Sequence, residues 1–197
     1  MSDPCNLYCS ERRFSVHHGI REWMLLTILV LLAVTACQET GDVNQGEILL
    51  SSEFDFETAS VNGFNFETGK RTRYPSTGEP LPDVIADMFR RVDGTVRPGF
   101  TSPSNPHGFS LAGAFESMGE SRDFFENELT AIDTTASFNP SSDTVREYQV
   151  WVLKTSLNKF VKLHVKETSV VKDPAGEHVE VLFDYYYQPD GSATFTQ

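Results

Sequence analysis

The last third of the chain limits the possible folds more than any other part, because three of its segments alternate apolar and polar side chains. These segments are residues 147–154, 160–167 and 179–187, and short runs of turn-forming residues separate them. Successive side chains of a β-strand point to opposite faces of a sheet, so a period of two is typical of strands. The pattern predicts three consecutive antiparallel strands, and residues 147–154 are expected to be central because they are apolar on both faces.

A short echo earlier in the chain predicts more β-structure. Phe-Asp-Phe-Glu-Thr at residues 54–58 returns as Phe-Asn-Phe-Glu-Thr at residues 64–68, and both copies alternate apolar and polar positions. Asn62 and Gly63 lie between the copies, and Asn-Gly is a strong hairpin signal. The polar, turn-rich residues 69–82 then predict a loop.

Two further segments carry helical periodicity. Residues 83–92 fit either a helix or a strand, because turn residues follow them closely. Residues 121–132 fit a helix better, with Ser121 as the N-cap and apolar residues on one face. The whole pattern predicts a mostly β fold: an antiparallel sheet or sandwich with one short helix, preceded by a signal peptide.

The signal peptide is predicted from the N-terminal segment. Residues 24–36 form an uncharged run of 13 residues, which at about 1.5 Å per helical residue falls short of the ~30 Å membrane core. Basic residues precede this run, and small residues followed by Cys37 end it. This order is typical of a bacterial lipoprotein signal, so we expect residues 1–36 to be removed and Cys37 to carry a lipid.

Composition excludes several classes of function. The formal net charge is −12 and the pI is near 4.8, which argues against binding to nucleic acid. Cys5 and Cys9 precede the predicted cleavage point, so the 161 residues that begin with Cys37 contain no other thiol. A disulfide, a cysteine nucleophile and a cysteine metal site are therefore excluded from the mature domain.

The C-terminal hairpin is similar to that of a known family. Val-Trp-Val-Leu-Lys-Thr at residues 150–155, followed by Asn-Lys-Phe-Val-Lys-Leu at residues 158–163, resembles a hairpin of the HmuY family, which are haem-binding lipoproteins of Bacteroidetes-type bacteria. Residues 181–192 resemble the last strand of that family, and residues 64–70 resemble an early one. Asn158 stands where the family has Gly, and Asn tolerates a positive φ.

This resemblance implies a domain organisation and a first ligand to consider. It implies a signal peptide over residues 1–36, a lipidated tether over residues 37–47 and a HmuY-like β domain over residues 48–197, which grips a ligand between finger-like loops. Haem is then the expected cofactor. The expected partners are the membrane, through the lipid on Cys37, and an outer-membrane transporter. The expected location is the outer membrane, with the choice between its inner and outer face left open.

Histidines are the first candidates for ligands to haem iron. Three lie beyond the predicted cleavage point: His107, His164 and His178. His107 lies in polar turn sequence that predicts an exposed loop, and His164 alternates with Lys162 and Lys166 on the predicted polar face of its strand. We expect His107 and His164 to bind the iron, together or singly, with the lysines beside the propionates. The alternative is that neither histidine binds a ligand: His107 would then be a surface residue in a turn, and His164 would lie on a solvated face of its strand.

Other side chains give weaker signals. Met88 and Met118 are possible soft ligands but also fit a core, and Tyr185 and Tyr187 are expected to face the core. Four aspartates lack the spacing of a calcium-binding loop. They are Asp55, Asp83, Asp87 and Asp93.

The sequence carries no catalytic motif for a serine, zinc or nucleotide-dependent enzyme, so we predict that the protein is not an enzyme. The favoured hypothesis is a lipid-anchored envelope protein that binds haem or another flat hydrophobic molecule and passes it to a membrane transporter. Two alternatives stay open: a β-sandwich module for adhesion to a protein or glycan, and a hydrolase that uses paired carboxylates.

Overall fold

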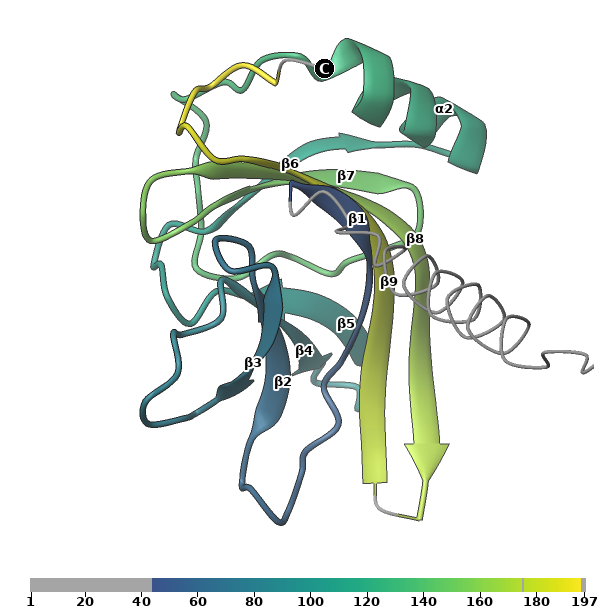
Figure 1. Cartoon of the computed structure of the whole chain (residues 1–197). Coiled ribbons are helices and arrows are strands. Elements are labelled where there is room, and N and C mark those ends of the chain that lie inside the picture. Colours follow the sequence, from purple (N-terminus) through teal and green to yellow (C-terminus); the bar gives the residue numbers. More distant parts are fainter. Residues whose placement is uncertain (1–43, 175, 196–197) are drawn as a thin grey trace, which may run out of the picture. The chain divides into compact units, whose positions relative to one another are not determined.

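The structure is a computed structural model, and it describes residues 44–174 and 176–195 (Figure 1). This part consists of two antiparallel β-sheets and one short helical segment, which confirms the predicted mostly β fold. The predicted signal peptide, Cys37 and most of the predicted tether lie outside the described residues. The tether prediction is wrong at its end, because residues 45–47 already pair with the sheet as part of the first strand; their side chains are polar because they are exposed at its edge.

Five strands form the larger sheet, in the order β1-β9-β8-β7-β6. They are β1 (Gln45–Ser51), β6 (Phe109–Ala114), β7 (Gln149–Lys154), β8 (Phe160–Asp173) and β9 (Gly176–Gln188). The predicted meander is confirmed, because β7 pairs with β8 and β8 pairs with β9. β7 lies between two strands, as its two apolar faces predict. Asn158 adopts a φ of 58° in the turn between β7 and β8.

Four strands form the smaller sheet, in the order β3-β2-β4-β5. They are β2 (Val61–Asn65), β3 (Lys70–Tyr74), β4 (Val84–Arg90) and β5 (Val96–Thr101). The ambiguous residues 83–92 therefore contain a strand, β4. The loop predicted over residues 69–82 begins with strand β3, whose polar sequence fits its position at an edge of the sheet.

The hairpin predicted from the sequence echo is wrong. Residues 54–58 form a turn, in which backbone N–H groups donate to the Asp55 carboxylate. Asn62 and Gly63 lie inside β2 and not in a turn. A Cβ at Gly63 would lie 2.5 Å from the Cβ of Pro82, so the glycine permits a close approach of neighbouring chain.

The two sheets enclose one apolar core. Trp151 and Leu153 of β7 face this core, while Val150 and Val152 lie in a second cluster on the outer face, as predicted. The aromatic residues of the core come from both sheets and include the two tyrosines predicted to face it: Phe64, Phe66, Phe100, Phe109, Phe183, Tyr185 and Tyr187.

A short helical segment covers part of the outer face of the larger sheet (Figure 1). Helix α2 (Met118–Asp123) continues into one π-helical turn, η1 (Phe124–Glu128). The predicted helix bounds are wrong, because the N-cap is Ser117, whose Oγ accepts from Glu120 N at 3.3 Å. Ser121 instead lies inside α2 and points into the protein. A second apolar cluster fills the space beneath this segment: Phe125, Leu129, Ile132, Val150, Val152, Phe160 and Phe195.

Candidate functional site

His164 lies on β8, on the face of the larger sheet that α2 covers, and it is fully buried. Its Nε2 lies 2.9 Å from Ser121 Oγ, and its Nδ1 lies 3.6 Å from Asp184 Oδ2 on β9. The Phe125 ring stacks on the imidazole with 5.5 Å between the ring centroids. The prediction that His164 lies on an open polar face is therefore wrong, because the alternation of a strand defines its two faces but not what covers them.

Ser121, His164 and Asp184 follow the order of a hydrolase triad, and their burial decides what they can do. Ser121 Oγ lies 3.0 Å and 3.1 Å from the backbone oxygens of Ser117 and Met118. Because a carbonyl only accepts, Ser121 Oγ donates to the helix backbone and accepts from His164 Nε2. A nucleophilic serine needs the opposite polarity and a path to its substrate. The bond between Ser121 and His164 instead fastens α2 to the sheet, whereas His164 Nδ1 has no hydrogen-bond partner among the described residues.

Asp184, the carboxylate that faces His164, carries a negative charge. Burial raises the pKa of its carboxyl group, but the approach of His164 and the charge of Lys166 outweigh that effect, so the pKa lies below its ordinary value. Lys166 Nζ lies 3.4 Å from Asp184 Oδ1 and also pairs with Glu47 on β1. Lys166, which was expected beside a propionate, is thus paired within the protein.

Lys162, the other lysine beside His164, is also turned into the protein. Its Nζ donates to the backbone oxygen of Phe125. The rings of Phe125, Tyr186 and Phe195 surround the ammonium, with centroids at 4.8, 5.4 and 5.2 Å. Burial lowers the pKa of this ammonium. Lys162 therefore holds the helical segment and the C-terminal residues on the sheet.

His107 lies in the loop between β5 and β6 and is exposed, as predicted. Asn105 shapes this loop, because its Oδ1 accepts from His107 N while its Nδ2 donates to the backbone oxygen of Lys154. The Nδ1 of His107 lies 3.4 Å from the backbone oxygen of Phe138. Since a carbonyl only accepts, Nδ1 carries the proton in this contact, and Nε2 keeps a lone pair that can bind a metal.

The two histidines do not share a site. Lys154 N donates to the oxygen of Gly108, next to His107, whereas Val150 pairs with His164. Four residues separate Val150 from Lys154, which is about 14 Å along a strand. His164 is also fully buried under α2, whereas His107 lies in an exposed loop, so the structure does not bring the two imidazoles together.

An apolar cleft of about 290 Å³ opens beside β6. Strands β6 and β7 supply one wall, and residues 129–138 supply the other. Its lining residues are Ser110, Leu111, Ala112, Leu129, Ala131, Ile132, Asp133, Ala136, Phe138 and Val152. Phe138 lines the cleft and its backbone oxygen contacts the His107 ring, so His107 lies next to one residue of the cleft wall. Leu111 leaves 47% of its surface exposed at this cleft.

The outer wall of the cleft is fixed at both ends. Ile132 N donates to the oxygen of Ala193, and Phe195 N donates to the oxygen of Thr130, both at 2.8 Å. At the other end, residues 138–139 are held because Asn139 pairs with Phe109. The cleft is therefore formed before any ligand arrives, which lowers the entropic cost of binding.

Lys154 places a positive charge close to the cleft. It follows Val152 by two residues on β7, so both side chains project from the same face of the sheet. No carboxylate of the described residues forms an ion pair with it, in contrast with Lys159 and Lys166. Lys154 can therefore meet a carboxylate of a ligand that extends out of the cleft.

The remaining candidates from the sequence do not form a metal site. His178 lies between Asp173 and Glu180, with nitrogen–oxygen distances of 3.7 and 3.9 Å. Within residues 44–174 and 176–195, no group of three histidine or acidic side chains could hold a metal ion. Met88 packs against the core. Burial raises the pKa of the Asp83 carboxyl group to about 6.

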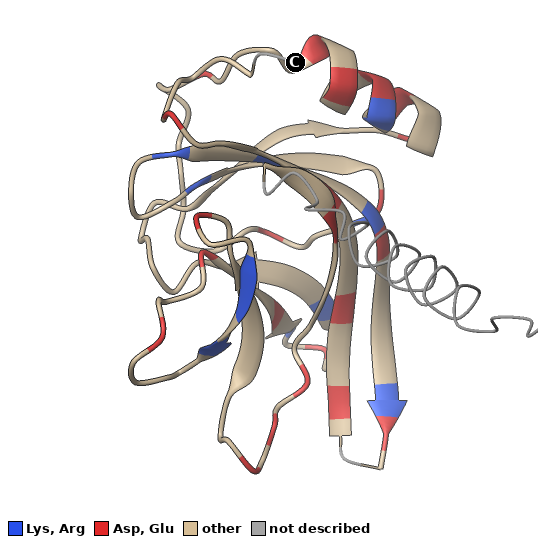
Figure 2. Ribbon diagram, viewed as in Figure 1, with Lys and Arg blue, Asp and Glu red and all other residues tan. Residues whose placement is uncertain are grey.

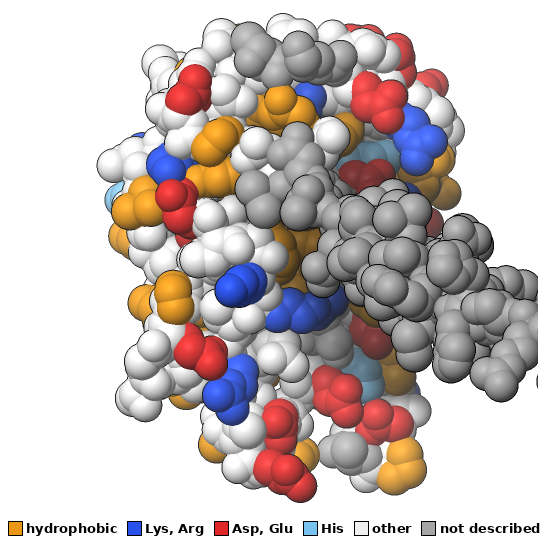
Figure 3. Space-filling view, in the orientation of Figure 1, with side chains coloured by type: hydrophobic (Ala, Val, Ile, Leu, Met, Phe, Trp, Pro, Cys, Tyr) orange, Lys and Arg blue, Asp and Glu red, His pale blue; other side chains and the backbone are white. Residues whose placement is uncertain are grey.

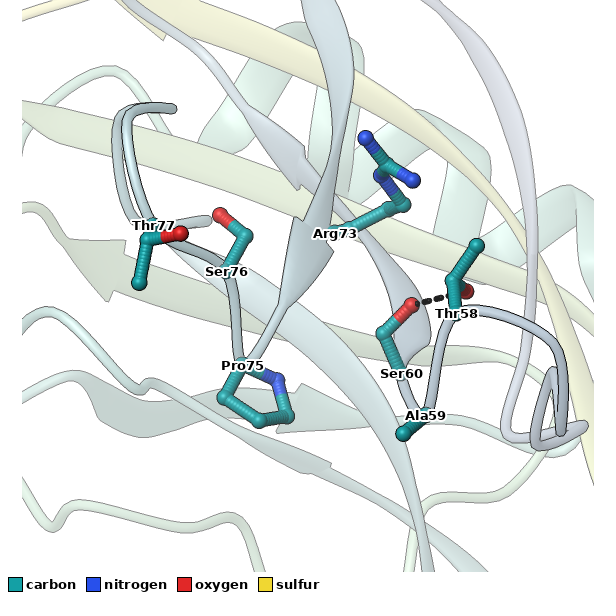
Figure 4. A pocket seen from close by; sticks show the side chains of 7 residues that line it. All are labelled: Thr58, Ala59, Ser60, Arg73, Pro75, Ser76 and Thr77. Atoms are coloured by element: carbon teal, nitrogen blue, oxygen red, sulfur yellow. Dashed lines mark hydrogen bonds between the residues drawn. The ribbon is translucent and has the colours of Figure 1, made fainter.

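A second hollow, of about 420 Å³, lies between the turn before β2 and the loop after β3 (Figure 4). Arg73 pairs with Glu79 at 3.3 Å, and the hydroxyls of Thr58 and Ser60 lie 2.7 Å apart, whereas the buried Ser76 Oγ has no hydrogen-bond partner among the described residues. The walls lack a large apolar side chain. This hollow fits a flat apolar ligand less well than the cleft beside β6.

The sequence did not predict the cleft residues. Leu111, Ile132 and Phe138 come from two distant segments, and residues 129–138 have neither the period of a helix nor that of a strand. One available signal was Asn105 two residues before His107, since Asn side chains often fix loop backbones.

Comparison of the sequence with protein-family models and with curated proteins finds no match. Within the described part of the chain, none of the helices is both long and apolar enough to cross a membrane.

Proposed function

We propose that this protein is a non-catalytic, lipid-anchored binding protein of the outer membrane, which holds haem or a similar flat apolar molecule and passes it to a membrane transporter. The observation that supports this most strongly is the contact between Nδ1 of the exposed His107 and the backbone oxygen of Phe138, a residue that also lines the cleft, because this contact leaves Nε2 for a ligand. A metal-binding imidazole typically donates its second N–H in this way, which fixes the ring and its tautomer.

The dimensions of the cleft fit one edge of such a molecule. Small-molecule sites enclose about 300–1,000 Å³, so a cleft of about 290 Å³ lies just below this range and can hold only part of a large ligand. In such a complex Leu111 and Ile132 would contact an apolar part of the ligand, and His107 would supply an imidazole for its metal. The carboxylates of the ligand would then point toward solvent and Lys154, which suits their charge.

A haem titration of the full chain in detergent tests the site. We expect a shifted Soret band that saturates at one equivalent. His107→Ala should lose the shift, whereas His178→Ala, which removes an imidazole from the β8–β9 hairpin, should keep it. An unchanged spectrum for His107→Ala would reject this site.

Iron-free protoporphyrin separates the cleft from the iron ligand. Leu111→Asp places a charge in the apolar cleft and should weaken the binding of both haem and protoporphyrin. His107→Ala should weaken haem alone. If Leu111→Asp binds both molecules as the wild type does, the ligand lies elsewhere.

The anchor is tested separately. We expect Cys37→Ala to leave an unprocessed precursor, because the lipid acceptor is gone. Cleavage after Ala36 with membrane attachment retained would contradict the lipoprotein proposal. Protease treatment of whole cells would show which face of the outer membrane carries the protein.

A further inference from the structure

A second surface is built from alternating aromatic and acidic residues. Residues 53–57 read Glu-Phe-Asp-Phe-Glu and lie in the loop between β1 and β2. Phe54 is 45% exposed and Phe56 is 75% exposed, and their rings meet edge to face at 5.2 Å. Two aromatic rings left in water forgo the stabilisation that burial would give, so a paired exposure of this kind indicates a binding surface.

The loop presents these rings on a fixed backbone. Asp55 accepts from Glu57 N at 2.9 Å and from Thr58 Oγ1 at 2.7 Å. Asp55 and Ser60 also exchange two backbone hydrogen bonds. The rings therefore do not depend on a partner to order the loop, which reduces the cost of binding.

A hollow of about 580 Å³ adjoins the two rings. Leu49, Asn62 and Arg71 line its other side, and Arg71 Nη2 donates to the backbone oxygen of Leu49 at 2.7 Å. A smaller hollow of about 190 Å³ lies against the same Leu49 side chain. Its other lining residues are Glu167, Ser169, Glu180 and Leu182. The two hollows thus offer apolar contact next to carboxylates.

The charge of this surface indicates what binds to it. Figures 2 and 3 show acidic residues along the β1–β2 loop and at that end of the molecule, with basic residues of β3 and β8 near them. Asp55 is engaged in the turn, but Glu53 and Glu57 form no ion pair with any described residue. An aromatic face beside carboxylates attracts an ammonium or guanidinium group through both the ring and the charge. The net charge of −12 adds a long-range attraction for cations.

We propose that this surface, formed by Leu49, residues 53–57 and Arg71, docks a protein segment in which Lys or Arg side chains alternate with apolar ones. Such a segment matches the Glu-Phe-Asp-Phe-Glu order, with its cations at Glu53 and Glu57 and its apolar side chains in the hollow. The surface lies beside β1, whereas the cleft lies beside β6 at the opposite edge of the larger sheet. A partner can therefore dock here while the cleft stays accessible, and the inference does not depend on the proposed function.

A labelled peptide tests this surface directly. The full chain in detergent is titrated into a fluorescein-labelled peptide with alternating Lys and Leu, and the anisotropy is followed. We expect saturable binding that weakens as the ionic strength rises to about 0.5 M, since exposed charges are then screened. Phe56→Ala and the double variant Glu53→Gln/Glu57→Gln should each weaken binding about tenfold. Val92→Ala, which trims another exposed apolar side chain, should leave it unchanged.

Location and chemistry are checked in the same experiment. Hydrogen–deuterium exchange should show protection over residues 49–57 and 71 when the Lys/Leu peptide is present. A matched peptide with Glu in place of Lys should not bind. Protection at other residues, equal binding of the Glu peptide, or full affinity in Phe56→Ala would each overturn the proposal. Protection of the same residues by cellohexaose, with none by the Lys/Leu peptide, would also overturn it and would assign the surface to a neutral glycan.

Discussion

His107 and His164 differ in how far the protein encloses their imidazole rings. Around His164 the protein is closed, because α2 lies over the imidazole and both ring nitrogens face protein groups. Around His107 it is open, because one nitrogen contacts the carbonyl of Phe138 and the other faces outward from an exposed loop.

The difference shows what makes a histidine available to a ligand. A strand position alone does not decide it, since His164 was expected on a polar face and is fully buried. The deciding features are which nitrogen the protein itself uses and whether the other nitrogen opens on a cavity. By that criterion the region of His164 holds the fold together, and the region of His107 is the one we propose for binding.

The largest effect should come from breaking the closed region. His164→Ala leaves a cavity under α2, removes the partner of Ser121 and leaves Asp184 without its imidazole. We expect the free energy of unfolding to fall by about 4 kcal/mol, as for other buried aromatic side chains. Urea unfolding followed by circular dichroism measures this change. A loss as small as that of a surface substitution would contradict the structural role of His164.

The loop that carries His107 offers a pH-dependent test. Asp83 accepts from Ser104 Oγ of this loop at 3.2 Å and from Phe66 N at 2.9 Å, and its burial raises the pKa from its ordinary value of 3.8 to about 6. A raised pKa means that the folded state binds the proton more tightly than the unfolded state. The stabilisation from protonated Asp83 is therefore complete below pH 3.8 and lost as the pH rises through about 6.

Asp83→Asn should remove this dependence, because Asn stays neutral. We expect the variant to gain stability relative to the wild type between pH 4 and pH 7, by about 3 kcal/mol at the upper end. Urea unfolding of both proteins at several pH values gives the difference. A difference that does not change with pH would show that Asp83 titrates normally.

The cleft can be tested through its charge. If Lys154 meets a carboxylate of haem, Lys154→Met should weaken haem binding about tenfold. Haem dimethyl ester, which lacks both charges, should bind the variant and the wild type equally well. Equal weakening of both ligands would mean that Lys154 acts through packing and not through charge.

The smallest effect should come from the open region itself. His107→Ala removes an exposed ring, so the free energy of unfolding should change by no more than about 0.5 kcal/mol. Together with the large loss expected for His164→Ala, this contrast separates a binding role from a structural one. A loss above about 2 kcal/mol for His107→Ala would place His107 in the framework of the fold.

The sequence predicted well where neighbouring residues decide the structure. The three C-terminal strands, their order and the positive φ of Asn158 follow from local alternation and turn chemistry. The prediction from the sequence failed where contacts with a distant segment determine the local structure. Gly63 looked like a turn residue because the approach of Pro82 is invisible locally, and Ser121 looked like a cap although its partner is His164.

The candidate site was predictable only in part for the same reason. Polar turn composition correctly placed His107 in an exposed loop. The cleft near it depends on residues 129–138, which residues 193–195 hold in place. The spacing of apolar residues in the sequence does not predict that contact. The pattern of charged residues also failed to predict which lysines are free. Lys162 and Lys166 flank His164 in the sequence, but both are bound by groups of the protein itself.

The central claim is that one histidine, His107, presents a metal-binding nitrogen at an apolar cleft. The most direct test is a crystal structure of the protein soaked or grown with haem, with the iron located from its anomalous scattering. We predict the iron at coordination distance from His107 Nε2, with an edge of the macrocycle against Leu111 and Phe138. Iron bound to His164, or bound at a site that does not include His107, would contradict this claim.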